Sequence, residues 1–204
     1  LYGTFAWCTS RMVLRRLSRD LVQAGGKAPP VPAEDGELTL VPGPQIPSAL
    51  IHGSKIYLED LDLDCHGTND AKEWGELIAS QVFPKTVTKD NKESDSHWVV
   101  EFTKRFAILP DSLFDHLSQT GTEVQPHVRI DPDFKRVDKG ALWYEESLPA
   151  ESILCGLVWS DGISDGDLKK NVMDLLTSRL VQMGGKSSVG KGRVSLQFFD
   201  SSAQ

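Results

Sequence analysis

The sequence is poor in cysteine and contains no long apolar run. Its three cysteines, Cys8, Cys65 and Cys155, are far apart in 204 residues and form no C-x-x-C pair, which argues against a disulfide framework. No stretch approaches the roughly 18 to 20 apolar residues that a membrane-spanning helix needs. The chain also lacks the charged start and apolar core of a secretory signal. We therefore expect reduced thiols, no membrane contact and a cytoplasmic location.

An excess of positive charge is also missing. The 22 Lys and Arg residues are outnumbered by 29 Asp and Glu residues, which gives a net charge of −7. Any contact with nucleic acid must therefore be local. Separate basic and acidic patches also suit association between copies of the chain. The basic residues lie near the two ends and the acidic block between them: Arg11, Arg15, Arg16, Arg19, Lys186, Lys191 and Arg193 against Glu59, Asp60, Asp62 and Asp64.

Signatures of catalysis and metal binding are absent as well. The histidines have no metal-ligand spacing, and no nucleophilic triad is visible in the sequence. Asp62 and Asp64 suit the solvated face of a strand, whereas Asp111, Asp131 and Asp133 suit caps and turns. We therefore assign no catalytic residue and no metal site to this chain.

Periodicity, cap residues and turn residues predict the elements of the first 121 residues. Six of the eleven prolines lie in residues 27–55, which is why no regular element is expected there. In chain order we expect a helix over 10–24 ended by Gly25-Gly26, the irregular insertion over 27–55, a strand with a bulge over 56–63, a helix capped by Thr68 or Asn69 and ended by Pro84, a loop over 85–96, strand-like sequence over 98–109, and a short helix from Asp111 through Leu117.

The remaining sequence predicts a hairpin and a further strand, helix and strand. Asp131-Pro132-Asp133 is a turn signal between β-like pieces, so we expect a hairpin over 122–147. The nearly unbroken apolar run over 152–159 is typical of a central strand buried on both faces. A helix capped by Ser164 or Asp165 and a final strand should follow. The helix should bury Leu168, Val172, Leu175, Leu176 and Val181, and the strand should alternate Val194, Leu196 and Phe198.

A glycine-rich stretch, GGKSSVGKGRV over 184–194, raises the question of phosphate binding. It matches the nucleotide loop G-x-x-x-x-G-K from Gly185 to Lys191, but Gly192 replaces the hydroxyl residue that holds magnesium. We expect the loop to follow a helix ending near Met183, with Gly184 as its cap, whereas a nucleotide loop precedes a helix. Contact with an RNA or DNA backbone and a plain flexible loop both remain open. The RNA-binding candidates are Gly185, Lys186, Ser187, Ser188, Gly190, Lys191, Gly192 and Arg193.

Four stretches resemble, in the same order, motifs of the RAMP proteins of type III-B CRISPR systems. They are LYGTFAW with the arginine-rich sequence after it, KRFAILPDSLFDHL, TEVQPHVRIDPDFKRVDKGALWYEESLP and GGKSSVGKGRV. The chain is most similar to the repeated backbone subunit of the Cmr complex, and the resemblance covers essentially its whole length.

The resemblance implies an α+β fold, a modified ferredoxin-like (RRM-like) core from which a β-hairpin thumb projects. We expect a core part over 1–121 with the insertion at 27–55, the thumb hairpin over 122–147, and a C-terminal part over 148–204 with the core strand, helix, glycine-rich loop and last strand. The family's N-terminal part, with its first core strand and an aspartate linked to metal-dependent cutting of target RNA, is expected to be missing from this chain.

The function implied is that of a filament subunit bound to CRISPR guide RNA, with target RNA, head-to-tail copies of itself and other Cmr-complex subunits as partners. One alternative makes the intact subunit the endoribonuclease, with its catalytic Asp in the absent N-terminal part. This alternative requires divalent Mg or Mn, although no cofactor is expected in this chain itself. The other alternative is a protein-interaction module without RNA contact. The thumb residues expected near RNA are Thr122, Val124, His127, Arg129, Ile130, Leu142 and Trp143.

Overall fold

A mixed six-stranded sheet forms the body of the protein. The computed structural model describes residues 5–33, 37–44, 46–83, 86–87, 93–94, 97–131, 133–159, 166–177 and 180–198. Two strand pairs of the sheet, β1 with β8 and β2 with β5, are parallel, and the other pairs are antiparallel. Across the sheet the order is β1 (Trp7–Ser10), β8 (Phe106–Leu109), β2 (Thr39–Pro42), β5 (Leu61–Thr68), β4 (Lys55–Leu58) and β3 (Ile51–His52).

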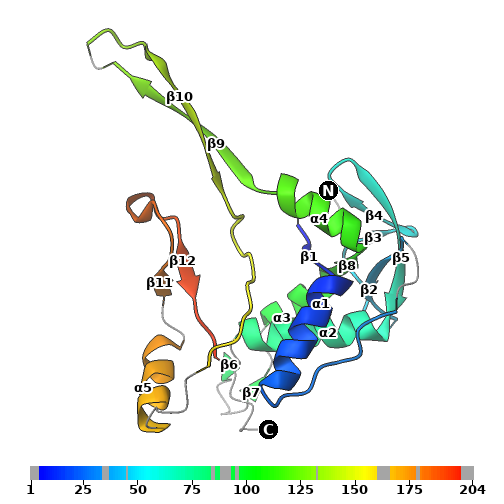
Figure 1. Cartoon of the computed structure of the whole chain (residues 1–204). Coiled ribbons are helices and arrows are strands. Elements are labelled where there is room, and N and C mark those ends of the chain that lie inside the picture. Colours follow the sequence, from blue (N-terminus) through cyan, green and yellow to red (C-terminus); the bar gives the residue numbers. More distant parts are fainter. Residues whose placement is uncertain are drawn as a thin grey trace.

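Helices cover both faces of this sheet (Figure 1). On one face lie α1 (Arg11–Gln23), α2 (Asn69–Val82) and α3 (His97–Lys104), whose apolar side chains pack with Phe106 and Ile108. On the other face lies α4 (Asp111–Thr120), which packs with Ala107 and Leu109. Because successive side chains of a strand point to opposite faces, β8 contributes to both apolar clusters.

Local signals set the beginnings of the first two long helices. The Ser10 hydroxyl accepts a hydrogen bond from the Val13 amide at 3.3 Å, and the Thr68 hydroxyl accepts one from the Ala71 amide at 3.2 Å. Each bond satisfies an amide that has no partner within its own helix. The predicted first helix and the Thr68 cap are therefore confirmed, while Pro84 lies outside the described residues.

A long hairpin projects from the body, as Figure 1 shows. It consists of β9 (Glu123–Ile130) and β10 (Val137–Ser147), which are paired antiparallel. At the tip, the Asp131 carboxylate accepts hydrogen bonds from the amides of Asp133 and Phe134 at 2.8 and 3.0 Å. The predicted hairpin and the role of Asp131 in its turn are confirmed.

The C-terminal elements lie apart from the sheet in Figure 1. They are α5 (Gly166–Leu176) and a small hairpin of β11 (Leu180–Gln182) and β12 (Arg193–Ser195), with the 3₁₀ turn η1 (Ser187–Val189) between its strands. Gly184 therefore lies inside a strand-to-strand connection and caps no helix, which corrects the prediction. Ser164 and Asp165 lie outside the described residues.

The proline-rich insertion is more ordered than predicted. It contains β3 and also β2, which lies between β8 and β5 in the sheet. The buried Arg11 guanidinium, 3% exposed, donates to the carbonyls of Ala33 at 3.1 Å and Leu38 at 3.3 Å. The Trp74 indole N–H donates to the Pro30 carbonyl at 2.9 Å. The predicted irregular insertion is therefore wrong for 39–42 and 51–52, and its irregular part is anchored to α1 and α2.

Several other predicted elements differ from the structure. The expected bulged strand over 56–63 is two strands, β4 and β5, joined by a turn in which Glu59 has a φ of 53°. The strand-like sequence expected over 98–109 does contain a strand, β8, but α3 precedes it. The expected loop over 85–96 contains a short pair, β6 (Thr86–Val87) and β7 (Glu93–Ser94). Each of these segments contains at least one element that is too short for a helical or strand period of apolar residues to be recognised in the sequence.

Asp111 begins α4 but does not cap it. Pro110 occupies the cap position without a side-chain bond, and the helix continues past Leu117 to Thr120. The Asp111 carboxylate instead accepts a hydrogen bond from the Met12 amide at 2.9 Å. It therefore ties the first turn of α4 to the first turn of α1, which local sequence does not reveal.

The predicted buried strand over 152–159 is absent. These residues form no strand, and Leu154 and Trp159 are 81% and 80% exposed. The predicted core stripe of the following helix is wrong for Val172 and Leu175, which are exposed, and for Val181, which belongs to β11. Leu176 is half-buried, and the side chain of Leu168 lies outside the described part of the chain. The final strand ends at Ser195, before Leu196 and Phe198. An apolar run indicates a preference for burial, but partners elsewhere decide whether burial occurs.

Candidate nucleic-acid interface

The two faces of the β9–β10 hairpin differ in chemistry. Residues directly opposite each other in an antiparallel pair lie on the same face. One face carries the pairs Gln125 with Glu145 and His127 with Trp143, and we call it the polar face. The other face, the apolar face, carries Val124 opposite Glu146, Pro126 opposite Tyr144, Val128 opposite Leu142 and Ile130 opposite Val137.

Glu145 is the centre of a contact network on the polar face. Its Oε1 accepts hydrogen bonds from the Trp143 indole N–H at 3.1 Å and from the Lys186 Nζ at 2.6 Å. Its Oε2 lies 3.5 Å from His127 Nε2. The rings of His127 and Trp143 stack, with centroids 5.6 Å apart and planes 16° apart. The hairpin therefore presents a stacked aromatic pair beside a carboxylate that binds a lysine.

The donors around Glu145 stabilise its ionised form. The Lys186 ammonium, followed by the Trp143 N–H, lowers the pKa of Glu145 from 4.5 to about 2. Because the charged lysine lies 2.6 Å away, the bond is charge-assisted. Glu145 is consequently a carboxylate throughout the neutral pH range.

The glycine-rich loop contacts the same face at a second point. Lys191 Nζ donates to the Ser147 hydroxyl at 3.2 Å. The loop also closes on itself, since the Met183 amide donates to the Gly192 carbonyl at 2.9 Å and the Gln182 side chain donates to the Lys191 carbonyl at 3.0 Å. The two lysines of the loop therefore point toward the polar face of the hairpin.

The backbone explains three of the loop's four glycines. Gly184, Gly190 and Gly192 have φ values of 83°, 83° and 73°, a region that glycine adopts without a steric penalty. At Gly192 an added Cβ would also overlap the Met183 carbonyl oxygen. Gly185 has neither a positive φ nor a neighbour that a Cβ would meet. Gly190 and Gly192, which the sequence offered as RNA-binding candidates, therefore have a structural role in the loop.

The loop lies between the strands β11 and β12. The prediction that a helix ends directly before it is therefore wrong. No helix begins after it, because η1 spans only three residues and β12 follows. A nucleotide's phosphates would need backbone amides at the start of a helix. The loop therefore lacks the strand-loop-helix setting of a nucleotide site.

The structure brings some of the predicted residues together and separates others. Lys186 meets the polar face at Glu145, beside His127 and Trp143, and Lys191 meets it at Ser147. Val124 and Leu142 lie exposed on the apolar face. Most of the remaining candidates are exposed. The exposed ones in or beside the loop are Gly185, Ser187, Ser188, Gly190 and Arg193, and those toward the hairpin tip are Arg129 and Ile130. The other two candidates, Gly192 and Thr122, are half-buried.

Two residues of this arrangement were not predicted. Glu145 and Ser147 supply the hairpin's acceptors for the loop lysines, yet 41 and 44 positions separate the bonded residues. The acidic pair Glu145-Glu146 is visible in the sequence as a possible partner for basic residues. Only the pairing of β10 with β9 determines which of the two glutamates points toward the loop. Glu146 accepts from the Thr122 hydroxyl at 2.7 Å instead.

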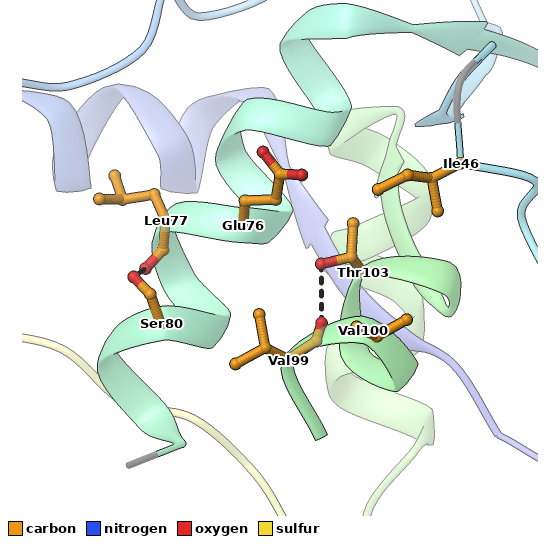
Figure 2. A pocket seen from close by; sticks show the side chains of 7 residues that line it. All are labelled: Ile46, Glu76, Leu77, Ser80, Val99, Val100 and Thr103. Atoms are coloured by element: carbon orange, nitrogen blue, oxygen red, sulfur yellow. Dashed lines mark hydrogen bonds between the residues drawn. The ribbon is translucent and has the colours of Figure 1, made fainter. Parts of the chain in front are cut away.

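A groove on the body of the protein lacks the chemistry of the hairpin and loop. This groove of about 450 Å³ between α2 and α3 is lined by Ile46, Glu76, Leu77, Ser80, Val99, Val100 and Thr103 (Figure 2). Its two hydroxyls are already bonded to backbone carbonyls, Ser80 to Leu77 at 2.8 Å and Thr103 to Val99 at 2.9 Å. Glu76 is its only ionisable lining residue, so the groove has no cluster of reactive groups.

The described part of the chain has neither a metal-binding cluster nor a membrane-spanning helix. It contains no group of three or more His, Cys, Asp or Glu side chains placed to hold a metal ion. Among the same residues, no helix combines the length and the apolar character needed to cross a membrane. Burial raises the pKa of Cys8 to about 12, which keeps this thiol protonated and unreactive.

Comparison with known proteins identifies relatives of nearly the whole chain. It is 30% identical over 202 residues to the CRISPR system Cmr endoribonuclease Cmr4 of Pyrococcus furiosus. The match covers 96% of this chain and 63% of that relative, so the chain spans less than two thirds of the relative's length.

Solved structures show the same fold. The crystal structure of oligomeric Cmr4 from Pyrococcus furiosus matches with a TM-score of 0.60 at 21% identity, over 96% of this chain and 65% of that one. The cryo-EM structure of the type III-B Cmr-beta bound to cognate target RNA matches with a TM-score of 0.55 at 19% identity, over 97% of this chain and 63% of that one. The predicted α+β fold, a ferredoxin-like RAMP core with a projecting hairpin, is confirmed.

The family follows from a match that spans most of the sequence. The model of the RAMP superfamily matches residues 24–195, from the end of α1 to the end of β12. This range includes five of the six strands of the sheet, all except β1, together with the projecting hairpin and the glycine-rich loop. The chain therefore belongs to the RAMP superfamily.

Proposed function

We propose that this chain binds CRISPR RNA as a backbone subunit of a type III-B effector complex and holds the duplex of guide and target RNA. The observation that carries the proposal is the meeting of the glycine-rich loop and the hairpin, where Lys186 contacts Glu145 beside the His127–Trp143 stack and Lys191 contacts Ser147 on the same face. Cations can bind phosphates and exposed aromatic rings can stack on bases, two contacts that need no particular sequence.

The proposed partners are guide RNA, target RNA, further copies of the chain arranged head to tail, and other subunits of a Cmr complex in the cytoplasm. Two relatives support this proposal. One is described as oligomeric Cmr4, and another as Cmr-beta bound to cognate target RNA. A head-to-tail contact joins two different surfaces and extends into a filament when it does not close.

A net charge of −7 is compatible with this function. Base pairing with the guide selects the target, so each subunit needs only a few phosphate contacts. Three cations, Lys186, Lys191 and Arg193, would give a slope of log affinity against log salt of about −2 on single-stranded RNA. Repetition of the subunit along one RNA strengthens the assembly through effective concentration.

The test is RNA binding by the assembled complex with Lys186, Lys191 and Arg193 all changed to Ala. We expect weaker binding and a salt slope shallower by about 2. The matched control changes Lys27, Lys55 and Lys170 to Ala, which alters the net charge equally away from the loop. Unchanged affinity and slope in the first variant would remove the loop from the RNA site, and a wild-type complex without salt-dependent RNA binding would favour a protein-interaction module.

A second candidate function is cutting of target RNA by the intact subunit, because the curated relative is described as an endoribonuclease. Such a reaction would need Mg²⁺ or Mn²⁺, but the described residues contain no carboxylate and histidine cluster that fits a metal ion. We therefore derive no catalytic step from this chain. Cleavage of target RNA by a complex assembled with this chain, dependent on added Mg²⁺ or Mn²⁺, would support this candidate.

A further inference from the structure

The lysine best placed to bind phosphate in the glycine-rich loop is already paired within the protein. Lys186 Nζ lies 2.6 Å from Glu145 Oε1, and no other residue of the loop forms an ion pair among the described contacts. An incoming phosphate would meet a lysine whose charge is neutralised by a neighbouring carboxylate. The contact therefore affects how strongly this loop can bind RNA.

The two partners differ in how firmly they are held. The Glu145 side chain is 18% exposed and also accepts the Trp143 N–H at 3.1 Å, whereas the Lys186 side chain is 56% exposed. A lysine ammonium has three donors on a flexible stem. Lys186 can consequently leave Glu145 by rotating its own side chain, without movement of the hairpin.

We propose that Glu145 substitutes for an RNA phosphate, holding Lys186 against the hairpin in the RNA-free protein and releasing it to the backbone when RNA binds. The inference rests on the proposed function and names the residue that regulates the same interface. A carboxylate and a phosphate oxygen are both anionic acceptors for a lysine ammonium. They repel each other, so they compete for Lys186.

The surroundings allow this exchange without leaving a buried charge unpaired. After Lys186 moves away, Glu145 keeps its hydrogen bond from Trp143 and lies 3.5 Å from His127 Nε2. The loop stays on the hairpin through the bond between Lys191 and Ser147 at 3.2 Å. Exposed ion pairs contribute little net free energy, so the contact tunes the affinity for RNA but does not block binding.

The test compares Glu145→Gln with Glu146→Gln in the 204-residue chain, using a short single-stranded RNA of mixed sequence. Both substitutions remove one negative charge from neighbouring positions on β10, but only Glu145 contacts Lys186. We expect Glu145→Gln to bind this RNA about two- to fivefold more tightly than the wild type. The salt slope should stay close to that of the wild type, because Lys186 reaches an RNA phosphate in both proteins.

A double-mutant cycle separates this role from general support of the loop. In a chain that already carries Lys186→Ala, we expect Glu145→Gln to leave the affinity for the same RNA unchanged. The lysine for which Glu145 and the RNA phosphate compete is then absent. If Glu145 only supported the loop, Glu145→Gln would weaken binding. Thermal unfolding of each variant checks that the isosteric amide leaves the fold intact.

The outcomes distinguish this inference from the proposed function. If the wild type binds RNA with a salt slope but Glu145→Gln behaves as Glu146→Gln or binds more weakly, the exchange is overturned and the RNA interface stands. If neither the wild type nor Glu145→Gln has salt-dependent affinity for RNA, both ideas fail. Tighter binding by Glu145→Gln alone, abolished by Lys186→Ala, supports the exchange.

Discussion

Lys186 Nζ donates to Glu145 Oε1 at 2.6 Å, although 41 positions separate the two residues. This ion pair joins the glycine-rich loop to the β9–β10 hairpin, two segments that each suggested contact with RNA. It also gives the hairpin an orientation, because the polar face meets the loop while the apolar face stays exposed.

The titration of Glu145 should depend on Lys186. Lys186 and Trp143 lower the pKa of Glu145 from 4.5 to about 2, so the ionised carboxylate is favoured in the folded protein. The contact then stabilises the loop fully above pH 4.5, and this stabilisation is lost as the pH falls toward 2. Lys186→Ala should raise the pKa toward 4.5, as measured by NMR of the Glu145 carboxyl carbon.

Lys191→Ala provides the matched control for that titration, since Lys191 donates to Ser147 and not to Glu145. It should leave the pKa of Glu145 where it is in the wild type. Equal titration curves for all three proteins would show that the ion pair with Lys186 does not form in solution.

Gly192→Ala should disrupt the glycine-rich loop, whereas Gly185→Ala should not. Gly192 has a φ of 73° and an added Cβ would overlap the Met183 carbonyl, so we expect a cost above about 1–2 kcal/mol. Gly185 has open space for a Cβ. Amide hydrogen exchange in β11 and β12 measures the effect, and equal protection in both variants would contradict it.

Arg11→Ala should release the proline-rich segment from α1. The guanidinium is buried and donates to the carbonyls of Ala33 and Leu38, and hydrogen bonds to a charged group contribute about 1.5–3 kcal/mol. Trypsin should then cleave faster after Lys27. The exposed Arg16 supplies the control, since Arg16→Ala should cleave at the wild-type rate.

Trp74→Phe should destabilise the protein moderately and Trp74→Ala strongly. The first change removes the hydrogen bond to the Pro30 carbonyl, worth about 1 kcal/mol, and only a small part of the buried ring volume. The second empties a fully buried site between α2 and the sheet and should cost about 3–5 kcal/mol. Urea unfolding measures both, and a Trp74→Phe variant as stable as the wild type would mean that the indole N–H contributes nothing.

The parts of the fold that could be predicted depend on neighbouring residues. Ser10 and Thr68 cap helices through bonds to amides three positions away, and Asp131 organises a turn through bonds two and three positions away. Such contacts can be read from spacing alone. The strand β2 could not be found in this way, because its four residues are buried on both faces and show no period.

The apolar run over 152–159 illustrates the opposite limit. Its composition predicted burial, yet Leu154 and Trp159 are exposed in the structure. Hydrophobicity measures the gain from burial, but realising that gain needs a surface that covers the residue. The sequence of the run carries no information about that surface.

At the candidate interface, residue types were readable from the sequence and their meeting was not. Lys186, Lys191, His127 and Trp143 could be nominated because cations and aromatic rings suit RNA. Composition also bounded the answer, since a chain with 29 acidic and 22 basic residues can bind RNA only through a local patch. The tertiary structure alone decided that Glu145, and not Glu146, receives Lys186, because the register of β10 against β9 determines which face each carboxylate occupies.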